Sequence, residues 1–221
     1  KVLIVARDEE KLAEVRRTIT DRGGYAKTYS CDITDYAAND KLARDILKEF
    51  GAVDILINNA GRSIRRSINL SYDRFHDFER TIQLNYFACV RLTMNLLPAM
   101  TARKSGHIVN TASEAGLVTT NVLGMYCATK HAVVGMSEAL YRELEGTGVG
   151  VSALCPNLVN TDIFLSERNR PHGAELTTEY CTEVPSREPV STFTDDLGWT
   201  SGLEVLPDGR LARRFRDGSA V

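Results

Sequence analysis

Tyr126 and Lys130 are the residue pair in this chain with the clearest capacity for proton transfer. They lie four positions apart in a stretch with helical periodicity, so both side chains are expected on one helix face. A tyrosine hydroxyl titrates near ~10 and is a poor acid at neutral pH. A neighbouring ammonium favours the phenolate and lowers that pKa. The pair therefore predicts a group that protonates a carbonyl oxygen or takes the proton of an alcohol.

Ser113 is a second candidate because of its position, directly after the apolar stretch His107–Thr111. We expect that stretch to be a strand, and in open α/β folds ligands bind at the carboxyl ends of the strands. The Ser113 hydroxyl could then hold the substrate oxygen that Tyr126 protonates. A serine at such a place also caps turns, so both roles are open for Ser113 considered alone.

The elements that must position these residues follow an alternating order. Apolar strands alternate with amphipathic helix-length stretches up to about residue 165, which predicts an α/β fold with a doubly wound, three-layer parallel sheet of the Rossmann type. Residues 1–165 are expected to form the core, and residues 166–221 a C-terminal segment of the same domain, with a hairpin turn at Pro207-Asp208-Gly209. The expected strands are Val2–Ala6, Tyr25–Cys31, Val53–Ile57, His107–Thr111 and Val149–Leu154, and the expected helices span residues 36–50, 75–100 and 125–145 after a first helix capped by Asp8.

The composition excludes several classes of protein. The 27 basic and 29 acidic side chains nearly balance, whereas nucleic-acid binders usually carry a marked basic excess. No apolar run reaches the length of a membrane span, and no basic-then-apolar leader is present, so we expect a cytoplasmic protein. The five cysteines and four histidines show no ligand spacing, so we expect no metal site. The arginines at 210–216 are interpreted as a solvated face rather than as a patch for membranes or nucleic acid.

Several motifs taken together resemble the short-chain dehydrogenase/reductase family over roughly residues 1–165. The resemblance implies a Rossmann-type enzyme that passes a hydride between a nicotinamide dinucleotide and a small-molecule carbonyl or alcohol. It also implies a homodimer or homotetramer, because many members pair through the two helices that here hold Asn85 and Tyr126. The motifs are Asn58-Asn59-Ala60-Gly61 after a strand, Asn85 within a helix, Ser113, Tyr126-Cys127-Ala128-Thr129-Lys130, and Pro156-Asn157-Leu158-Val159-Asn160-Thr161.

The resemblance also implies roles for individual residues. Tyr126 would be the general acid/base, and Lys130 would lower its pKa and bind the nicotinamide ribose. Ser113 would orient the substrate oxygen, and Asn85 would support a water in a proton relay. The implied cofactor contacts are Asp32 and Ile33 at the adenine, Asn59, Ala60 and Gly61 along the cofactor cleft, and Val159 and Thr161 at the carboxamide.

Arg7 bears on the choice of cofactor. In this family an acidic residue at the end of the second strand binds the 2′-hydroxyl of NAD. Here that place holds Ala6, followed by Arg7. A guanidinium matches a 2′-phosphate in charge and in geometry, so the residues predict a preference for NADP(H).

Two functions remain open at this point. No glycine precedes Gly23, so the first strand and the glycine-rich pyrophosphate turn of the family are lacking from this sequence. The chain is therefore either an NADP(H)-dependent oxidoreductase or a catalytically silent member that serves as an interaction module. Residues 58–87 resemble the branch with fatty acyl-CoA and long-chain aldehyde reductases, which implies a lipid-like substrate. Arg62, Arg65 and Arg66 would then either meet an anionic head group or form a solvated loop.

Overall fold

The computed structural model describes residues 1–119, 121, 123–157, 199–205 and 211–215. Residues 1–157 belong to one compact unit, and the two strands near the C-terminal end belong to a second. Each unit is described by itself.

The strands of the first unit are all parallel. β1 (Val2–Ala6) pairs with β2 (Ala26–Ser30), with Val2 opposite Ala26. β3 (Ile55–Asn58), β4 (Gly106–Thr111) and β5 (Val149–Leu154) form a second parallel sheet in this order. Among the described residues no strand joins β1 to β3. The parallel strands with intervening helices confirm the predicted α/β class.

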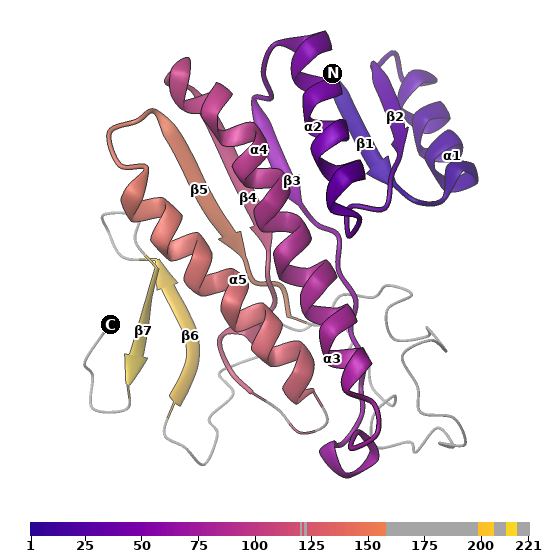
Figure 1. The fold of residues 1–221 in the computed structure, drawn as a ribbon. Helices are drawn as coiled ribbons and strands as arrows, with labels where there is room; N and C mark the ends of the chain where they lie inside the picture. Colours follow the sequence, from indigo (N-terminus) through magenta and orange to yellow (C-terminus); the bar gives the residue numbers. More distant parts are fainter. Residues whose placement is uncertain (120, 122, 158–198, 206–210, 216–221) are drawn as a thin grey trace. The chain divides into compact units, whose positions relative to one another are not determined.

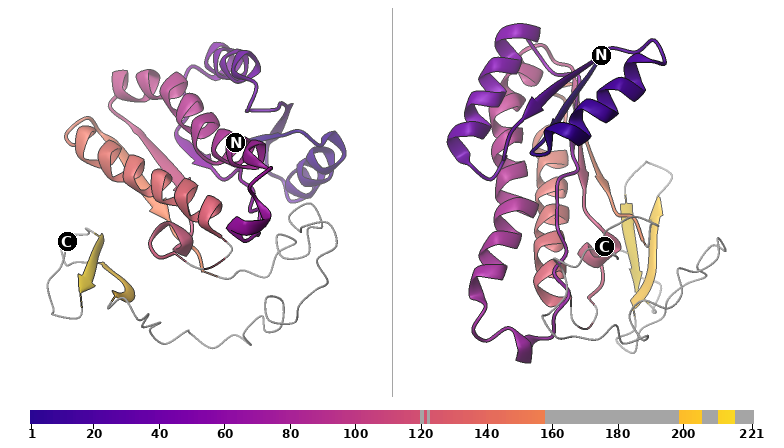
Figure 2. Two further views of the ribbon diagram at one scale, coloured as in Figure 1. Left: turned by 60° about the horizontal axis from the view of Figure 1, so that its bottom comes forward. Right: turned by 90° about the vertical axis from the view of Figure 1, so that its right-hand side faces the viewer.

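Helices connect the strands and begin where the sequence predicts. Asp8 caps the first helix by accepting a hydrogen bond from the Lys11 backbone N–H at 3.0 Å, and Asp35 caps the second in the same way. The helices are α1 (Glu9–Thr20), α2 (Tyr36–Phe50), α3 (Phe75–Ile82), α4 (Ala88–Ala102) and α5 (Gly124–Glu143). The helices α2, α4 and α5 lie side by side across one face of the strands (Figure 1), and α1 lies on the other side of β1 and β2 (Figure 2).

The stretch expected as one helix over residues 75–100 contains an irregular turn. Residues Gln83–Phe87 form a π-helical turn between α3 and α4, so the three segments make one continuous rod. A π-helical turn inserts an extra residue into the helix and is frequent at functional sites. Asn85, a predicted site residue, lies at the centre of this turn.

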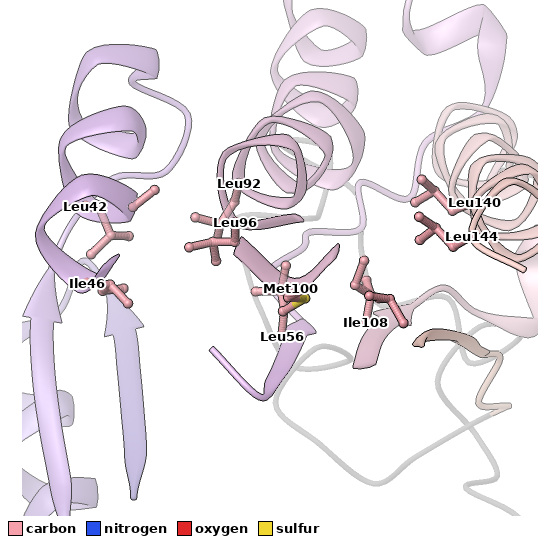
Figure 3. Packing of buried hydrophobic residues seen from close by; sticks show 11 residues of the cluster. Leu42, Ile46, Leu56, Leu92, Leu96, Met100, Ile108, Leu140 and Leu144 are labelled. Atoms are coloured by element: carbon pink, nitrogen blue, oxygen red, sulfur yellow. The ribbon is translucent and has the colours of Figure 1, made fainter. Parts of the chain in front are cut away.

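The hydrophobic core lies between the three aligned helices and the strands β3 and β4 (Figure 3). Met100 of α4 and Ile108 of β4 are completely buried, and Leu96 is 2% exposed. Leu92, Leu96 and Met100 recur every four residues, so α4 presents one continuous apolar stripe to this core. The core therefore fixes the rod that carries Asn85 against the strand that leads to Ser113.

β3 is less buried than expected. The predicted three-layer sheet would bury both faces of this strand, but the side chains alternate, with Leu56 and Asn58 buried and Ile55 and Ile57 59% and 62% exposed. Successive side chains of a strand point to opposite faces. The described helices that pack on β3 cover only the face to which Leu56 points, which explains the alternation.

Buried asparagines join the carboxyl ends of β3 and β4. The Asn58 Nδ2 donates to Asn110 Oδ1 at 2.8 Å and to Thr93 Oγ1 at 3.0 Å. The Asn110 Nδ2 in turn donates to Ser137 Oγ of α5 at 2.9 Å. Because a buried polar network is stable only when its members are paired, these bonds define how β3, β4, α4 and α5 meet. The network includes Asn58, the residue directly before the predicted cofactor contact Asn59.

The second unit contains the predicted hairpin strands. β6 (Trp199–Val205) pairs antiparallel with β7 (Leu211–Phe215), with Val205 opposite Leu211. The predicted Pro207-Asp208-Gly209 turn and the ends of the arginine cluster lie outside the described residues. In the part of the chain that the structure describes, no helix has the length and apolarity needed to cross a bilayer.

Candidate active site

Ser113 lies just beyond the carboxyl end of β4 and begins a 3₁₀ turn, η3 (Glu114–Gly116). Its hydroxyl accepts a hydrogen bond from the Ala115 N–H at 3.2 Å, which is the capping role that the sequence also allowed. Gly116 lets this turn pack directly on α5, since a Cβ there would lie 2.7 Å from the Lys130 carbonyl oxygen. The turn thus brings Ser113 to the helix that carries Tyr126.

Tyr126 lies in the first turn of α5, half-buried, and its hydroxyl is hydrogen-bonded to Ser113. Burial raises the pKa of Tyr126 above its ordinary value, and the bond to Ser113 and the charge of Arg65 oppose that rise only in part. The sequence predicted that Lys130 would lower this pKa. In the structure burial outweighs any such effect, and the Lys130 Nζ lies 5.7 Å from the centre of the Tyr126 ring.

Lys130 is a buried cation, with only 4% of the residue exposed. Its Nζ donates a hydrogen bond of 2.7 Å to the carbonyl oxygen of Thr111, which is the last residue of β4. Burial lowers the pKa of Lys130, because the charged form loses the hydration it has in water. A Cβ on Gly61 would lie 3.6 Å from this Nζ, so Lys130 also borders the loop after β3.

Asn85 holds that loop in place. It is 1% exposed, and its Oδ1 accepts the Arg62 N–H at 2.8 Å. Its Nδ2 donates to the Arg62 carbonyl oxygen and to Thr129 Oγ1, each at 2.9 Å. Both amide protons are therefore bound to protein groups. Asn85 positions the backbone after Gly61, and its part in a proton relay stays a prediction.

We expect Asn85→Leu, which keeps the number and branching of the side-chain heavy atoms, to destabilise the fold by about 2–3 kcal/mol, because buried polar groups of Arg62 and Thr129 lose their partners. Urea unfolding measures this loss. The matched control is Asn95→Leu, on α4, where the amide bonds only a surface aspartate, Asp40. Equal stability of the Asn85 variant and the wild type would contradict the positioning role.

Arg7 and Asp32 meet at the carboxyl ends of β1 and β2. The parallel pairing places them side by side, with the Arg7 Nη1 3.5 Å from Asp32 Oδ2. The Asp32 Oδ1 accepts hydrogen bonds from the Thr34 hydroxyl and N–H at 2.7 and 3.0 Å, and these bonds to Thr34 lower the Asp32 pKa more than the charge of Arg7 does. Ile33 is half-buried and packs against the core. Two predicted cofactor contacts are thus brought together.

The other predicted cofactor contacts divide into two groups. Asn59, Ala60 and Gly61 are exposed beyond the end of β3, as a cleft-lining loop requires. Val159 and Thr161 lie outside the described residues. The pKa of Arg62, the residue after Gly61, is lowered by burial first and then by the charges of Arg80 and Arg7.

Sequence reasoning missed one contact of the site and misjudged another. Thr129 is 2% exposed. Its Oγ1 accepts a hydrogen bond from Asn85 and donates one to the Tyr126 carbonyl oxygen at 2.8 Å, so Thr129 connects α5 to the residue that holds the loop after β3. Arg66, expected to face an anionic head group or solvent, is instead buried against Asp77, with its Nη1 2.5 Å from Asp77 Oδ2. The only signal for Thr129 was its place inside the Tyr126–Lys130 motif. No spacing rule links residues eleven apart.

The comparisons with known proteins agree with this geometry. The family described as short chain dehydrogenase matches residues 1–171. The chain belongs to this family. That assignment explains the parallel strands and the convergence of Ser113, Tyr126 and Lys130 beyond β4.

Two relatives are named for one kind of reduction. A fatty acyl-CoA reductase of Acinetobacter baylyi is 46% identical over 183 residues, which is 83% of this chain and 62% of the relative. A fatty acyl-CoA reductase of Mycobacterium tuberculosis is 43% identical over 164 residues, 74% of this chain and 56% of the relative. The chain thus spans less than two thirds of the length of these relatives.

Solved structures share the fold and differ in the cofactor they hold. A metagenomic short-chain oxidoreductase in complex with NADP has a TM-score of 0.67 and 33% identity, over 71% of this chain and 70% of the other. A short chain dehydrogenase/reductase from Burkholderia phymatum in complex with NAD has a TM-score of 0.71 and 33% identity, over 85% of this chain and 65% of the other. The family likeness alone therefore leaves the choice of dinucleotide to particular residues.

Proposed function

We propose that this protein is an NADP(H)-dependent oxidoreductase that interconverts a carbonyl and an alcohol. The observation that carries the proposal is the convergence of Ser113, Tyr126 and Lys130 beyond the carboxyl end of β4. The residues present fit a nicotinamide dinucleotide, since the exposed glycine Gly61 leaves room in front of Lys130 and Arg7 offers a cation at β1. When bound, the dinucleotide supplies or accepts the hydride.

The side chains of this chain handle the proton. The Ser113 hydroxyl orients the substrate oxygen, and the Tyr126 hydroxyl donates its proton to that oxygen as the carbonyl is reduced. The raised pKa of Tyr126 keeps the hydroxyl protonated at neutral pH, as a proton donor must be. The Lys130 ammonium, close to the ring, then stabilises the phenolate that remains. In alcohol oxidation the same groups act in reverse.

Arg7→Ala tests the cofactor preference. Removing the guanidinium takes away the cation offered to a 2′-phosphate, so we expect NADPH affinity to fall about tenfold while NADH affinity stays within about threefold. Fluorescence titration with both dinucleotides measures the ratio. The matched control is Arg17→Ala, an exposed arginine on α1. Unchanged NADPH affinity with an unchanged ratio would rule out the role of Arg7.

The proposed substrate is a lipid-like carbonyl compound, because two relatives are named as fatty acyl-CoA reductases. The comparisons do not favour the catalytically silent alternative, and the contacts among Ser113, Tyr126 and Lys130 support the enzyme. NADPH oxidation with aldehydes of increasing chain length tests this class. Rates that do not rise with chain length would argue against it.

We further propose a homodimer or homotetramer in the cytoplasm. Phe87 and Met94, on the rod of α3 and α4, are 44% and 52% exposed, and Tyr141 of α5 is 52% exposed. Such exposed apolar side chains fit a contact between copies along α4 and α5. Cys31, Cys89 and Cys127 are thiols, as a reducing compartment favours.

A further inference from the structure

The segment that leads into α3 has its polarity inverted. Four large apolar side chains within eight residues point outward: Ile68, Leu70, Tyr72 and Phe75 are 67%, 54%, 82% and 69% exposed. Polar groups of the same region point inward, with Ser71 at 6% and Asp77 at 5% exposed. Folding normally buries apolar side chains and leaves charged ones in water. This segment does the reverse, and clustered exposed apolar side chains often mark a surface that binds a partner.

Buried polar contacts hold the segment in this orientation. Asp77 pairs with Arg66 at 2.5 Å and with Arg74 at 3.0 Å, and the Arg66 and Asp77 side chains are only 8% and 7% exposed. The Ser71 hydroxyl donates to the Ser67 carbonyl oxygen at 2.9 Å. Because these polar contacts occupy the inner side, the apolar side chains cannot turn inward without breaking them. The outer surface is therefore preorganised.

Successive backbone turns make the same segment compact. The η1 turn (Ile68–Leu70) is closed by the Ser71 N–H on the Ile68 carbonyl oxygen at 2.9 Å. The Arg74 N–H then bonds the Ser71 carbonyl oxygen at 3.0 Å and leads into α3. The segment lies at the α3 end of the α3–α4 rod, opposite the end at which α4 terminates (Figure 1). The apolar side chains thus protrude from a structured end of the molecule.

The charges around the segment favour an anionic partner. Residues 62–77 contain four arginines and two aspartates, so this stretch keeps a net positive charge of two with His76 uncharged, although Arg66 is buried against Asp77. Exposed aliphatic and aromatic side chains flanked by arginines are the features by which proteins lie on anionic bilayers. Tyrosine suits the water–lipid boundary, because its ring is apolar and its hydroxyl is polar. Four protruding side chains match a broad surface better than a single narrow ligand.

We propose that residues 68–75 dock the protein on the surface of an anionic lipid bilayer, with the apolar side chains inserted at the head-group level. The docking segment begins six residues after Arg62, whose backbone N–H and carbonyl oxygen are bound by the site residue Asn85, so it continues from the loop at the candidate active site. A lipid-like substrate would then enter from the bilayer. The docking itself does not depend on the proposed reaction.

Vesicle co-sedimentation of the purified protein tests the docking. We expect binding to vesicles of phosphatidylcholine and phosphatidylglycerol, weaker binding to phosphatidylcholine alone, and weakening at about 0.5 M salt. The double variant Leu70→Ser/Phe75→Ser is expected to bind the anionic vesicles about tenfold more weakly, because two inserted apolar side chains are lost. Both side chains are exposed, so thermal unfolding of the variant should match the wild type.

The control is Val15→Ser, which removes an exposed apolar side chain from α1 and should leave vesicle binding unchanged. Two results would overturn the proposal: no binding of the wild type to anionic vesicles, or equal binding of the wild type and the double variant. Loss of self-association in the double variant, without vesicle binding by the wild type, would assign the segment to a contact between copies instead. Turnover is not measured, so failure of the proposed reaction leaves this test intact.

Discussion

Tyr126→Phe is expected to lower kcat about 1,000-fold with little change in cofactor affinity, because it removes only the hydroxyl that we propose as the proton donor. The ring keeps its place in the first turn of α5, and Ser113 still accepts the Ala115 N–H. Loss of one hydrogen bond should change the free energy of unfolding by about 1 kcal/mol or less. Steady-state turnover with NADPH and an aldehyde, together with NADPH titration, measures both effects.

The matched control for this variant is Tyr141→Phe. It removes the same hydroxyl from the same helix at a position that is 52% exposed. Its kcat and NADPH affinity are expected to equal those of the wild type. If Tyr126→Phe kept wild-type turnover, the assignment of the general acid would be wrong, and a loss confined to cofactor binding would point to a purely structural role.

Lys130→Met is expected to lower kcat about 100-fold while the fold stays at least as stable as the wild type. Lys130 is 4% exposed, and the partner that the structure gives its Nζ is a neutral carbonyl oxygen, that of Thr111. A buried charge facing a neutral group loses hydration without the gain of an ion pair, so an apolar side chain of similar length fits the site well. Activity and stability should therefore move independently.

The pH dependence of stability provides a second readout for Lys130. Its pKa is lowered in the folded state and returns toward 10.5 on unfolding, so the unfolded state binds this proton more tightly. The wild type then gains stability as the pH rises from the lowered pKa toward 10.5. Below the lowered pKa, Lys130 is charged in both states, and the full cost of burying its charge applies. The stability advantage of Lys130→Met is expected to be largest below the lowered pKa and to shrink as the pH rises toward 10.5.

Urea unfolding at several pH values measures this advantage, and kcat comes from the same preparations. Lys11→Met, at an exposed position on α1, is the control and should change neither quantity. A strongly destabilised Lys130→Met variant at neutral pH would mean that the ammonium has an anionic partner, which contradicts this account. Unchanged turnover would remove Lys130 from the mechanism.

Local patterns were sufficient for most of the secondary structure. The helix Tyr36–Phe50 and the strand Val149–Leu154 have the bounds that the sequence predicts. Both are defined by neighbours in the chain: the helix by the capping residue Asp35 and by Gly51 at its end, and the strand by an apolar stretch that Pro156 stops. The burial of β3 was predicted wrongly, because the faces that helices cover depend on how distant elements pack.

The site shows the same division. The spacing of Tyr126 and Lys130, and their place in a motif with Ser113, could be read directly, because four residues on a helix define one face. The partners of Asn85 could not, since Arg62 is 23 residues away and Thr129 is 44 residues away. The pairing of Arg66 with Asp77 was equally invisible, although it decides which side chains of the docking segment face outward.

The sequence by itself therefore determined the α/β class, the order of the elements and the family likeness, and it supplied the proposed reacting groups, because these depend on residue types and short spacings. Only the tertiary structure decided the sign of the pKa shift at Tyr126 and the burial of Lys130. It also decided the inversion of polarity at residues 68–75. The reason is physical: desolvation and charge effects are set by every group packed around a site, and those groups come from segments far apart in the chain.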